Sequence, residues 1–368
     1  MMNLQATAND RQPCHVPEVE LVSLAIAVRW RRPTVIPGAV VANVLRGALG
    51  ITFRKLVCPA DWLAHPCVPC PMYSSCAYGL LFNPTPPDDA AQLRLQQDLP
   101  RPFVIEPPGL HPDTPVSPEQ MTFALTLFGK SIGHLPYFIT TLERLGREGM
   151  GRDRVPFDVE SITARHPAGN EVLFTSGATV VRMPLRRLRT ADILETTGCH
   201  ASPSVLMPRV APLPAANPWL TVKLRFLTPT LLRTGSGIDS QGCRHSATEV
   251  RGRPPFGVVA RRLRDRLSAL CAFFGEPWRH PDFAALGTAA DTVRLVDSHT
   301  VWLTRQRRST RTGATHEISG FVGEAVYEFP DAATRDQFVP LLKLAEYIHV
   351  GKYAPWGHGK VLVEGDAG

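Results

Sequence analysis

The 368-residue sequence lacks the features that would assign it to a membrane or to a secreted scaffold. No run of apolar residues approaches the ~18 that indicate a membrane-spanning helix. The first twenty residues are polar and lack the apolar segment of a signal peptide. Acidic residues are fewer than basic ones, 33 against 40, which leaves a net charge of +7. We therefore expect a cytoplasmic protein with an anionic partner.

The remaining composition is that of a folded chain. Hydrophobic residues make up 44% and charged residues 20% of the sequence, which is ordinary for a soluble protein with a full core. The length allows two domains of normal size.

Arginine gathers in three stretches, at residues 182–189, 251–266 and 305–311. A planar guanidinium binds phosphate with two nitrogens and stacks on bases. Three such clusters favour nucleic acid over a small acidic metabolite as the partner. Any one cluster alone could equally be a basic surface exposed to solvent.

Hydrophobic periodicity predicts the same order of elements twice. The first copy has a strand at 21–30, a helix at 38–57, strands at 103–105 and 121–128, a helix at 134–146 and a strand at 156–162. The second has a strand at 220–227, a helix at 255–274, strands at 293–305 and 318–329, a helix at 332–347 and a strand at 361–364. Strand, helix, strand, strand, helix, strand is the ferredoxin-like order. We therefore predict an α+β fold of two tandem ferredoxin-like (RRM-like, βαββαβ) domains, with a basic cleft between their sheets.

The predicted domain boundaries follow from these elements. Residues 1–18 form a flexible arm, 19–165 the N-terminal domain, 166–218 a proline-rich linker with a hairpin near 171–183, and 219–368 the C-terminal domain. A cysteine-rich insertion occupies residues 58–76 of the first domain, and a glycine-rich loop occupies 351–360 of the second.

Half of the eight cysteines, Cys58, Cys67, Cys70 and Cys76, lie in the insertion. Disulfides rarely persist in the cytoplasm, so clustered thiols there suggest metal ligands. Four thiolates suit a structural zinc ion, and an iron–sulfur cluster uses the same ligands. Unliganded or disulfide-paired cysteines are the remaining alternative. Cys14, Cys199, Cys243 and Cys271 are scattered and carry no such signal.

The glycine-rich loop joins a helix to a strand. Gly351, Gly357 and Gly359 permit close approach to a ligand, while Lys352 and Lys360 add charge. The dinucleotide fingerprint and the P-loop both run from strand to helix, so neither motif is present here. A plain connection around a buried tryptophan is the alternative.

Several segments together resemble the CRISPR-associated, pre-crRNA-processing endoribonucleases of the repeat-associated (RAMP) superfamily. They are LRGALG (45–50), AYGLLF (77–82), LTLFGKSIGHLPYFITTLERLGREGMGR (125–152), LTPTLLRTG (227–235), ISGFVGEAVYEF (318–329) and LLKLAEYIHVGKYAPWGHGKV (341–361). The resemblance covers roughly residues 20–365. It implies RRM-like domains with a C-terminal glycine-rich loop.

The resemblance also implies binding of CRISPR repeat RNA and one cut that needs no metal. The ribose 2′-OH attacks the adjacent phosphate and leaves a 2′,3′-cyclic phosphate and a 5′-OH. Such chemistry uses a base for the 2′ proton, an acid for the 5′ oxygen and a cation for the phosphorane charge. No cofactor is expected for catalysis, and zinc would be structural.

The catalytic histidine that many relatives carry near the first helix is missing, because no histidine lies between Trp30 and Val57. Three readings remain. The proton transfers come from His349 and His358 with Lys352 on the phosphate; or they come from His65; or Arg31, Arg32 and Lys55 accelerate the reaction by orientation and charge alone. Alternatively, His349 has no catalytic role and simply interacts favourably with the dipole at the end of its helix.

The residues expected to bind RNA share a positive charge, an aromatic ring or a place in the glycine-rich loop. They are Arg31, Arg32, Lys55, Arg233, Arg261, Arg262, Arg266, Arg305, Arg307, Arg308, Gly351, Tyr353, Trp356, Gly357, Gly359 and Lys360. A non-catalytic crRNA-binding subunit of an effector complex would have the same fold and charge, so it is the main alternative function. A zinc-dependent DNA-binding regulator would explain the cysteines and arginines but not the duplicated element order.

Overall fold

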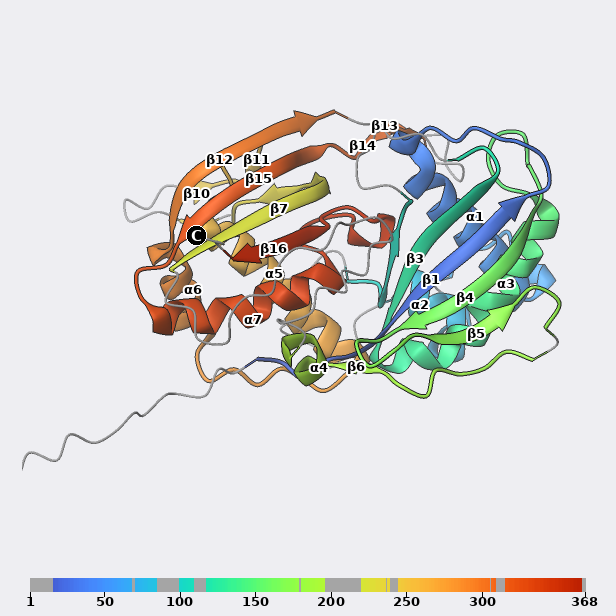
Figure 1. Ribbon diagram of the computed structural model, residues 1–368, viewed down its shortest axis with the longest axis horizontal. Helices are drawn as coiled ribbons and strands as arrows, with labels where there is room; N and C mark the ends of the chain where they lie inside the picture. Colours follow the sequence, from blue (N-terminus) through green and yellow to red (C-terminus); the bar gives the residue numbers. More distant parts are fainter. Residues whose placement is uncertain are drawn as a thin grey trace, which may run out of the picture.

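The computed structural model describes residues 16–67, 70–84, 99–108, 117–178, 180–195, 220–235, 237–238, 244–304, 306–308 and 315–365. Within these ranges the chain forms two α+β domains side by side (Figure 1). No described helix is long and apolar enough to cross a membrane.

The N-terminal domain has the predicted ferredoxin-like arrangement. Its elements are β1 (Glu20–Trp30), α1 (Gly38–Val57), β2 (Phe103–Glu106), β3 (Gln120–Phe128), α3 (Leu135–Glu148) and β4 (Phe157–Arg165). The antiparallel sheet has the order β2-β3-β1-β4-β5, so the first strand lies between the third and the fourth. The added strand β5 (Glu171–Thr175) pairs with β4, and β6 (Leu188–Arg189) pairs with the start of β1.

The C-terminal domain repeats the arrangement. Its elements are β7 (Thr221–Thr230), α5 (Phe256–Phe274), β12 (Arg294–Leu303), β15 (Gly320–Glu328), α7 (Ala332–Ile348) and β16 (Val361–Gly365), with the sheet order β12-β15-β7-β16. The two tandem ferredoxin-like domains are therefore confirmed. Helix α6 (Phe283–Thr292) was not predicted; Asp282 caps it by accepting hydrogen bonds from Ala284 N and Ala285 N.

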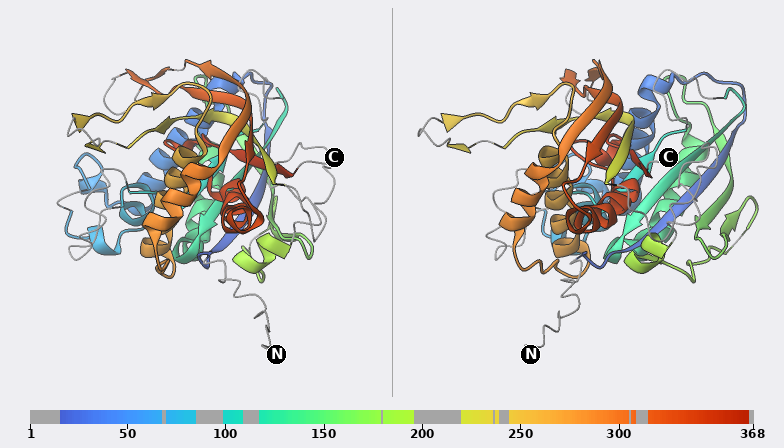
Figure 2. Two further views of the ribbon diagram at one scale, coloured as in Figure 1. Left: turned by 90° about the vertical axis from the view of Figure 1, so that its left-hand side faces the viewer. Right: turned by 60° about the vertical axis from the view of Figure 1, so that its left-hand side comes forward.

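Short elements complete the described chain. They are η1 (Ala60–Trp62), η2 (Tyr73–Ser75), α2 (Ala77–Phe82), η3 (Gly129–His134), α4 (Thr190–Glu195), η5 (Ala354–Trp356), and the paired strands β8 (Leu232–Arg233), β9 (Gly237–Ile238), β10 (Arg244–His245), β11 (Glu249–Val250), β13 (Gln306–Arg308) and β14 (Thr315–Glu317). Strands β8 to β11 form an arm that reaches outward from the C-terminal domain (Figure 2).

One hydrophobic cluster lies under each sheet. In β1, alternate residues Val22, Leu24, Ile26 and Val28 pack on Phe53 of α1 and Phe138 of α3. In β7, Val222, Leu224 and Phe226 pack on α5 and α7 in the same way. The period of two in the strands and of 3.6 in the helices thus produces two cores.

The junction between the domains is itself packed. Leu21, Val104 and Phe128 of the N-terminal sheet belong to the C-terminal cluster, together with Ile193 of α4. The hydroxyl of Thr190 donates to Pro17 O at 2.8 Å and accepts from Val19 N at 2.9 Å. Part of the predicted linker, residues 166–218, therefore contributes to the core. The rest of that linker (196–218) and most of the predicted arm (1–15) lie outside the described ranges.

Candidate functional site

The glycine-rich loop begins where α7 ends. His349 has a φ of +62°, which stops the helix, and Val350 N then donates to Gly359 O at 2.8 Å. Gly357 and Gly359 both have positive φ, of 76° and 72°. A β-carbon on Gly359 would overlap Val350 O, and one on Gly357 would overlap Ile105 O of the other domain. Gly357 and Gly359 must therefore be glycine because the backbone of the protein itself, and not a ligand, lies against them.

Three charged or ionisable groups meet in the junction beneath this loop. Lys360 Nζ donates to Glu106 Oε1 at 2.9 Å and to Glu346 O at 2.6 Å. His349 Nε2 lies 3.2 Å from the same Glu106 oxygen, and its Nδ1 lies 2.9 Å from His358 O. The side chains of Glu106, His349 and Lys360 are 8%, 0% and 2% exposed. Glu106 comes from β2 and the other two from the C-terminal domain, so the trio joins the domains.

Burial and charge shift the pKa values in this junction. Burial alone would raise the pKa of Glu106, but Lys360 and His349 outweigh it and hold the value at about 2. Burial lowers the pKa of His349, with Glu106 opposing the shift. Burial, helped by the neighbouring His349, lowers the pKa of His358 to about 4. At neutral pH the trio therefore holds an ionised carboxylate.

His349 and His358, which we predicted to transfer protons to and from RNA, are enclosed by protein in this conformation. Both imidazoles are buried, and both nitrogens of His349 are held by protein groups. A general base must come within hydrogen-bond reach of the proton it removes. An RNA 2′-OH at the surface cannot approach either ring in this conformation.

Trp356 of the loop packs on a basic residue of helix α1. The guanidinium carbon of Arg46, from α1, lies 5.2 Å from the ring centre of Trp356, 4.7 Å from that of Phe82 and 5.6 Å from that of Phe103. Arg101 lies 5.4 Å from the Trp356 ring. These cation–π contacts fasten the loop to the N-terminal domain. Trp356 is thus engaged by protein, contrary to the expectation that it stacks on RNA.

An open hollow of about 350 Å³ lies on the N-terminal domain between α1 and the turn after α3. Asn43, Thr52 and Lys55 line it from α1, with Glu148 and Arg154 opposite. Lys55 Nζ lies 3.2 Å from Glu148 Oε2, and Arg144 Nε donates to Glu148 Oε1 at 2.8 Å. The hydrogen bond from Arg144, followed by the one from Lys55, outweighs burial and lowers the pKa of Glu148.

Arg32 contacts the turn that borders this hollow. Its guanidinium donates to Asp153 O at 3.1 Å, next to Arg154. Of the three basic residues expected to act by charge alone, Lys55 lines the hollow, whereas Arg32 reaches only the adjoining turn. Arg31 pairs with Asp158 instead, at 2.7 Å.

The comparisons with known proteins agree with the fold. Residues 224–361 match the family model described as CRISPR-associated endoribonuclease Cas6. Residues 19–186 match a second model, AF_1859_N, described as an N-terminal domain.

Residues 224–361 are therefore similar to Cas6.

Solved Cas6 structures resemble the chain over nearly its whole length. A Cas6 (TTHB231) product complex is 16% identical, covers 94% of this chain and 99% of its own, and has a TM-score of 0.49. Thermus thermophilus Cas6 (TTHB231) is 14% identical with a TM-score of 0.47 and the same coverage. A partial Cas6-RT-Cas1–Cas2 complex is 11% identical, covers 95% of this chain and 46% of its own, and has a TM-score of 0.51. No curated protein matches in sequence.

The remaining residues predicted to be catalytic lie apart from one another. Lys352 is exposed and lies over the half-buried ring of Tyr353, with Nζ 5.2 Å from the ring centre. His65 is exposed and lies beside Trp62 in the cysteine-rich insertion. The three catalytic candidates of the loop and the one of the insertion thus do not form one constellation.

The arginines expected to bind RNA differ in how accessible they are. Arg233 is exposed on the arm and pairs with Glu249 at 2.9 Å. Arg261 pairs with Asp291, and Arg262 with Asp265 at 3.2 Å. Arg305 lies outside the described residues, and only the backbone of Arg307 and Arg308 is described.

Arg266 is turned inward. It donates to Ile348 O, at the end of α7, at 2.7 Å, and burial lowers its pKa to about 9. In this conformation Arg266 faces protein rather than the surface at which we predicted it to bind RNA. The same holds for Gly357, Gly359 and Lys360. Gly351 likewise packs on Leu231.

Sequence reasoning missed the acidic partner of the junction. Glu106 is the last residue of the short strand β2. The only signal in the sequence was an apolar strand that ends in a carboxylate, and an exposed strand end has the same pattern. The contacts of Arg46 were also missed, because its aromatic partners come from three segments distant in sequence.

Proposed function

We propose that this chain is a Cas6-type endoribonuclease, which binds CRISPR repeat RNA and cuts it once without a metal in the reaction. The match of residues 224–361 to the endoribonuclease family carries this proposal. In the proposed step a bond forms from the ribose 2′ oxygen to phosphorus, and the bond from phosphorus to the 5′ oxygen breaks. The 2′ proton leaves and the 5′ oxygen gains one, so the products are a 2′,3′-cyclic phosphate and a 5′-OH.

The hollow beside α1 is the concave surface that we assign to the scissile phosphate. Lys55 and Arg154 offer cationic donors from opposite walls, and Arg32 adds charge at the edge. Such donors stabilise the charge that develops on a phosphorane. Glu148 is ionised but is a weak base because its pKa is lowered. The acceleration therefore comes from orientation and charge, with solvent carrying the protons.

The arm and the exposed loop residues extend the proposed RNA surface. Arg233 and Arg251 are half or more exposed on the arm, at 50% and 68%. Lys352 and Tyr353 lie at the outer edge of the junction. The charges of Arg233, Arg251 and Lys352 bind phosphates without reading sequence, so these residues position the RNA.

A non-catalytic crRNA-binding subunit is the second candidate. The burial of His349 and His358 favours it, because it removes the two loop histidines from any exposed reaction centre. Incubating the purified chain with its own repeat RNA in EDTA separates the two functions. One defined cut with cyclic-phosphate and 5′-OH ends supports the enzyme. Tight binding without cutting supports the subunit.

A further inference from the structure

The cysteine-rich insertion has no apolar core of its own. No described residue between 58 and 76 is buried, and neither η1 nor η2 contains a buried residue. The segment nevertheless connects two packed helices. Cys58 follows the last turn of α1, where its N–H donates to Arg54 O at 2.8 Å, and Cys76 caps α2, where its carbonyl accepts from Leu80 N at 2.9 Å. Hydrophobic burial within the insertion does not explain its defined path.

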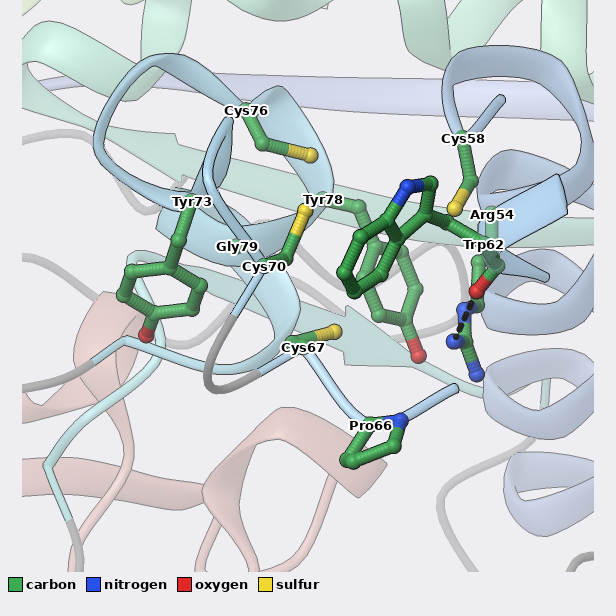
Figure 3. A pocket seen from close by; sticks show the side chains of 10 residues that line it. All are labelled: Arg54, Cys58, Trp62, Pro66, Cys67, Cys70, Tyr73, Cys76, Tyr78 and Gly79. Carbon is green, nitrogen blue, oxygen red and sulfur yellow. Dashed lines mark hydrogen bonds between the residues drawn. The ribbon is translucent and has the colours of Figure 1, made fainter. Parts of the chain in front are cut away.

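Four thiols converge in this segment. Cys58, Cys67, Cys70 and Cys76 line one cavity of about 20 Å³, together with Arg54, Trp62 and Tyr78. Figure 3 shows the sulfur atoms turned toward its interior. All four thiols are free, so no disulfide holds the insertion. A cavity of this volume is the size of one water molecule or one ion.

The thiols are near one another without yet forming a coordination shell. Among the described residues, no three histidine, cysteine or acidic side chains are grouped closely enough to hold a metal ion. Cys67 and Cys70 are joined by a turn in which Cys70 N donates to Cys67 O at 2.8 Å. Short surface turns without buried residues can shift by the distance that zinc–sulfur bonds of ~2.3 Å require.

The charge beside the thiols suits a tetrathiolate site. Zinc with four thiolates carries two negative charges, and the guanidinium of Arg54 lines the same cavity. Arg54 is held there by hydrogen bonds to Trp62 O and His65 O. A cation beside the cluster offsets part of its excess charge.

We infer that Cys58, Cys67, Cys70 and Cys76 bind one structural zinc ion that closes the insertion and ties the end of α1 to the start of α2. Binding would supply the stability that the insertion lacks, because metal binding to a segment without a core contributes directly to its folding. The inference does not rest on the nuclease activity.

The test uses the purified full chain. Elemental analysis should find one zinc per chain, and cobalt(II) added to chelator-treated protein should give thiolate-to-cobalt charge-transfer absorption. The four thiols should react with a thiol reagent only after chelation. Cys70→Ser and Cys76→Ser should each lose most of the zinc, whereas Cys271→Ala, which changes a buried thiol in α5, should keep it.

Chelation of the wild-type protein keeps the test independent of how the variants fold. Chelation should lower the melting temperature, and added zinc should restore it. A chain without zinc that gives no cobalt spectrum would overturn the inference. So would iron with labile sulfide, or disulfides among these four cysteines in mass spectra.

Discussion

Lys360 Nζ donates to Glu106 Oε1 at 2.9 Å across 254 residues of sequence and between two domains. Both side chains are buried, at 2% and 8% exposure, and His349 shares the same carboxylate. A buried pair of this kind is not a large net source of stability, but loss of one partner leaves an uncompensated charge. The position of the glycine-rich loop against β2 therefore depends on the pair being complete.

Removal of one partner should destabilise the chain strongly. We expect Glu106→Gln to lower the free energy of unfolding by about 3–5 kcal/mol, because Lys360 would stay buried without its counter-charge. The double substitution Glu106→Gln/Lys360→Met should cost less than the sum of the two single ones. Urea unfolding of the three variants measures this, and strictly additive losses would show that the pair is uncoupled.

Acid should weaken the folded state in two stages. His358 has a folded pKa of about 4, against 6.5 unfolded, and burial also lowers the pKa of His349. Below pH 6.5 these histidines are protonated in the unfolded chain but stay neutral in the folded chain. The stability that they contribute is therefore complete above pH 6.5 and is lost as the pH falls from 6.5 to 4. Glu106, at about 2 folded against 4.5 unfolded, adds a second fall between 4.5 and 2.

The measurement is the urea midpoint as a function of pH. The first stage corresponds to roughly 2–4 kcal/mol for His358. His358→Asn removes this group, so its profile should be flatter between pH 6.5 and 4 while the fall below 4.5 remains. Identical profiles for wild type and His358→Asn would contradict the assignment.

A side chain at Gly359 should act on folding before it acts on RNA. Its φ is +72°, and a β-carbon would overlap Val350 O. We expect Gly359→Val to lower the melting temperature markedly, with weaker RNA binding only in proportion to the unfolded fraction. Gly133→Val is the matched control, because a β-carbon there meets nothing within 4 Å and the residue lies outside the hollow. If Gly359→Val had wild-type stability but no longer bound RNA, the loop would contact RNA directly, contrary to this prediction.

Substitution of an exposed arginine should change the salt dependence of RNA binding, whereas substitution of a buried arginine should not. Arg233→Ala should weaken binding and reduce the salt slope by roughly 0.7 to 1, as expected for one lost phosphate contact. Arg266→Ala should leave the slope unchanged and lower stability, because its guanidinium caps α7 at Ile348 O. Equal salt slopes for Arg233→Ala and wild type would show that Arg233 on the arm does not contact RNA phosphates.

The fold could be predicted because it depends on local patterns. Apolar residues alternate in β1 and β7 and recur at helical spacing in α3 and α7, and these periods fix the βαββαβ order. Helix α6 was missed because it is short and rich in alanine. The site could not be predicted as well, because Glu106, Lys360 and His349 meet only through the packing of two domains. Sequence shows which side chains can carry charge or protons, but not which of them become buried.

Comparison of two variants tests the central claim, that His349 helps to hold the domains together while the hollow beside α1 stabilises the reaction. Cleavage of repeat RNA in EDTA and thermal unfolding are measured for Lys55→Met and His349→Gln. We predict that Lys55→Met melts near the wild-type temperature and cuts about 10²-fold more slowly, since it removes a donor to the developing charge. His349→Gln should melt lower but cut at the wild-type rate per folded molecule. A stable His349→Gln protein that has lost cleavage, beside a fully active Lys55→Met protein, would contradict the account.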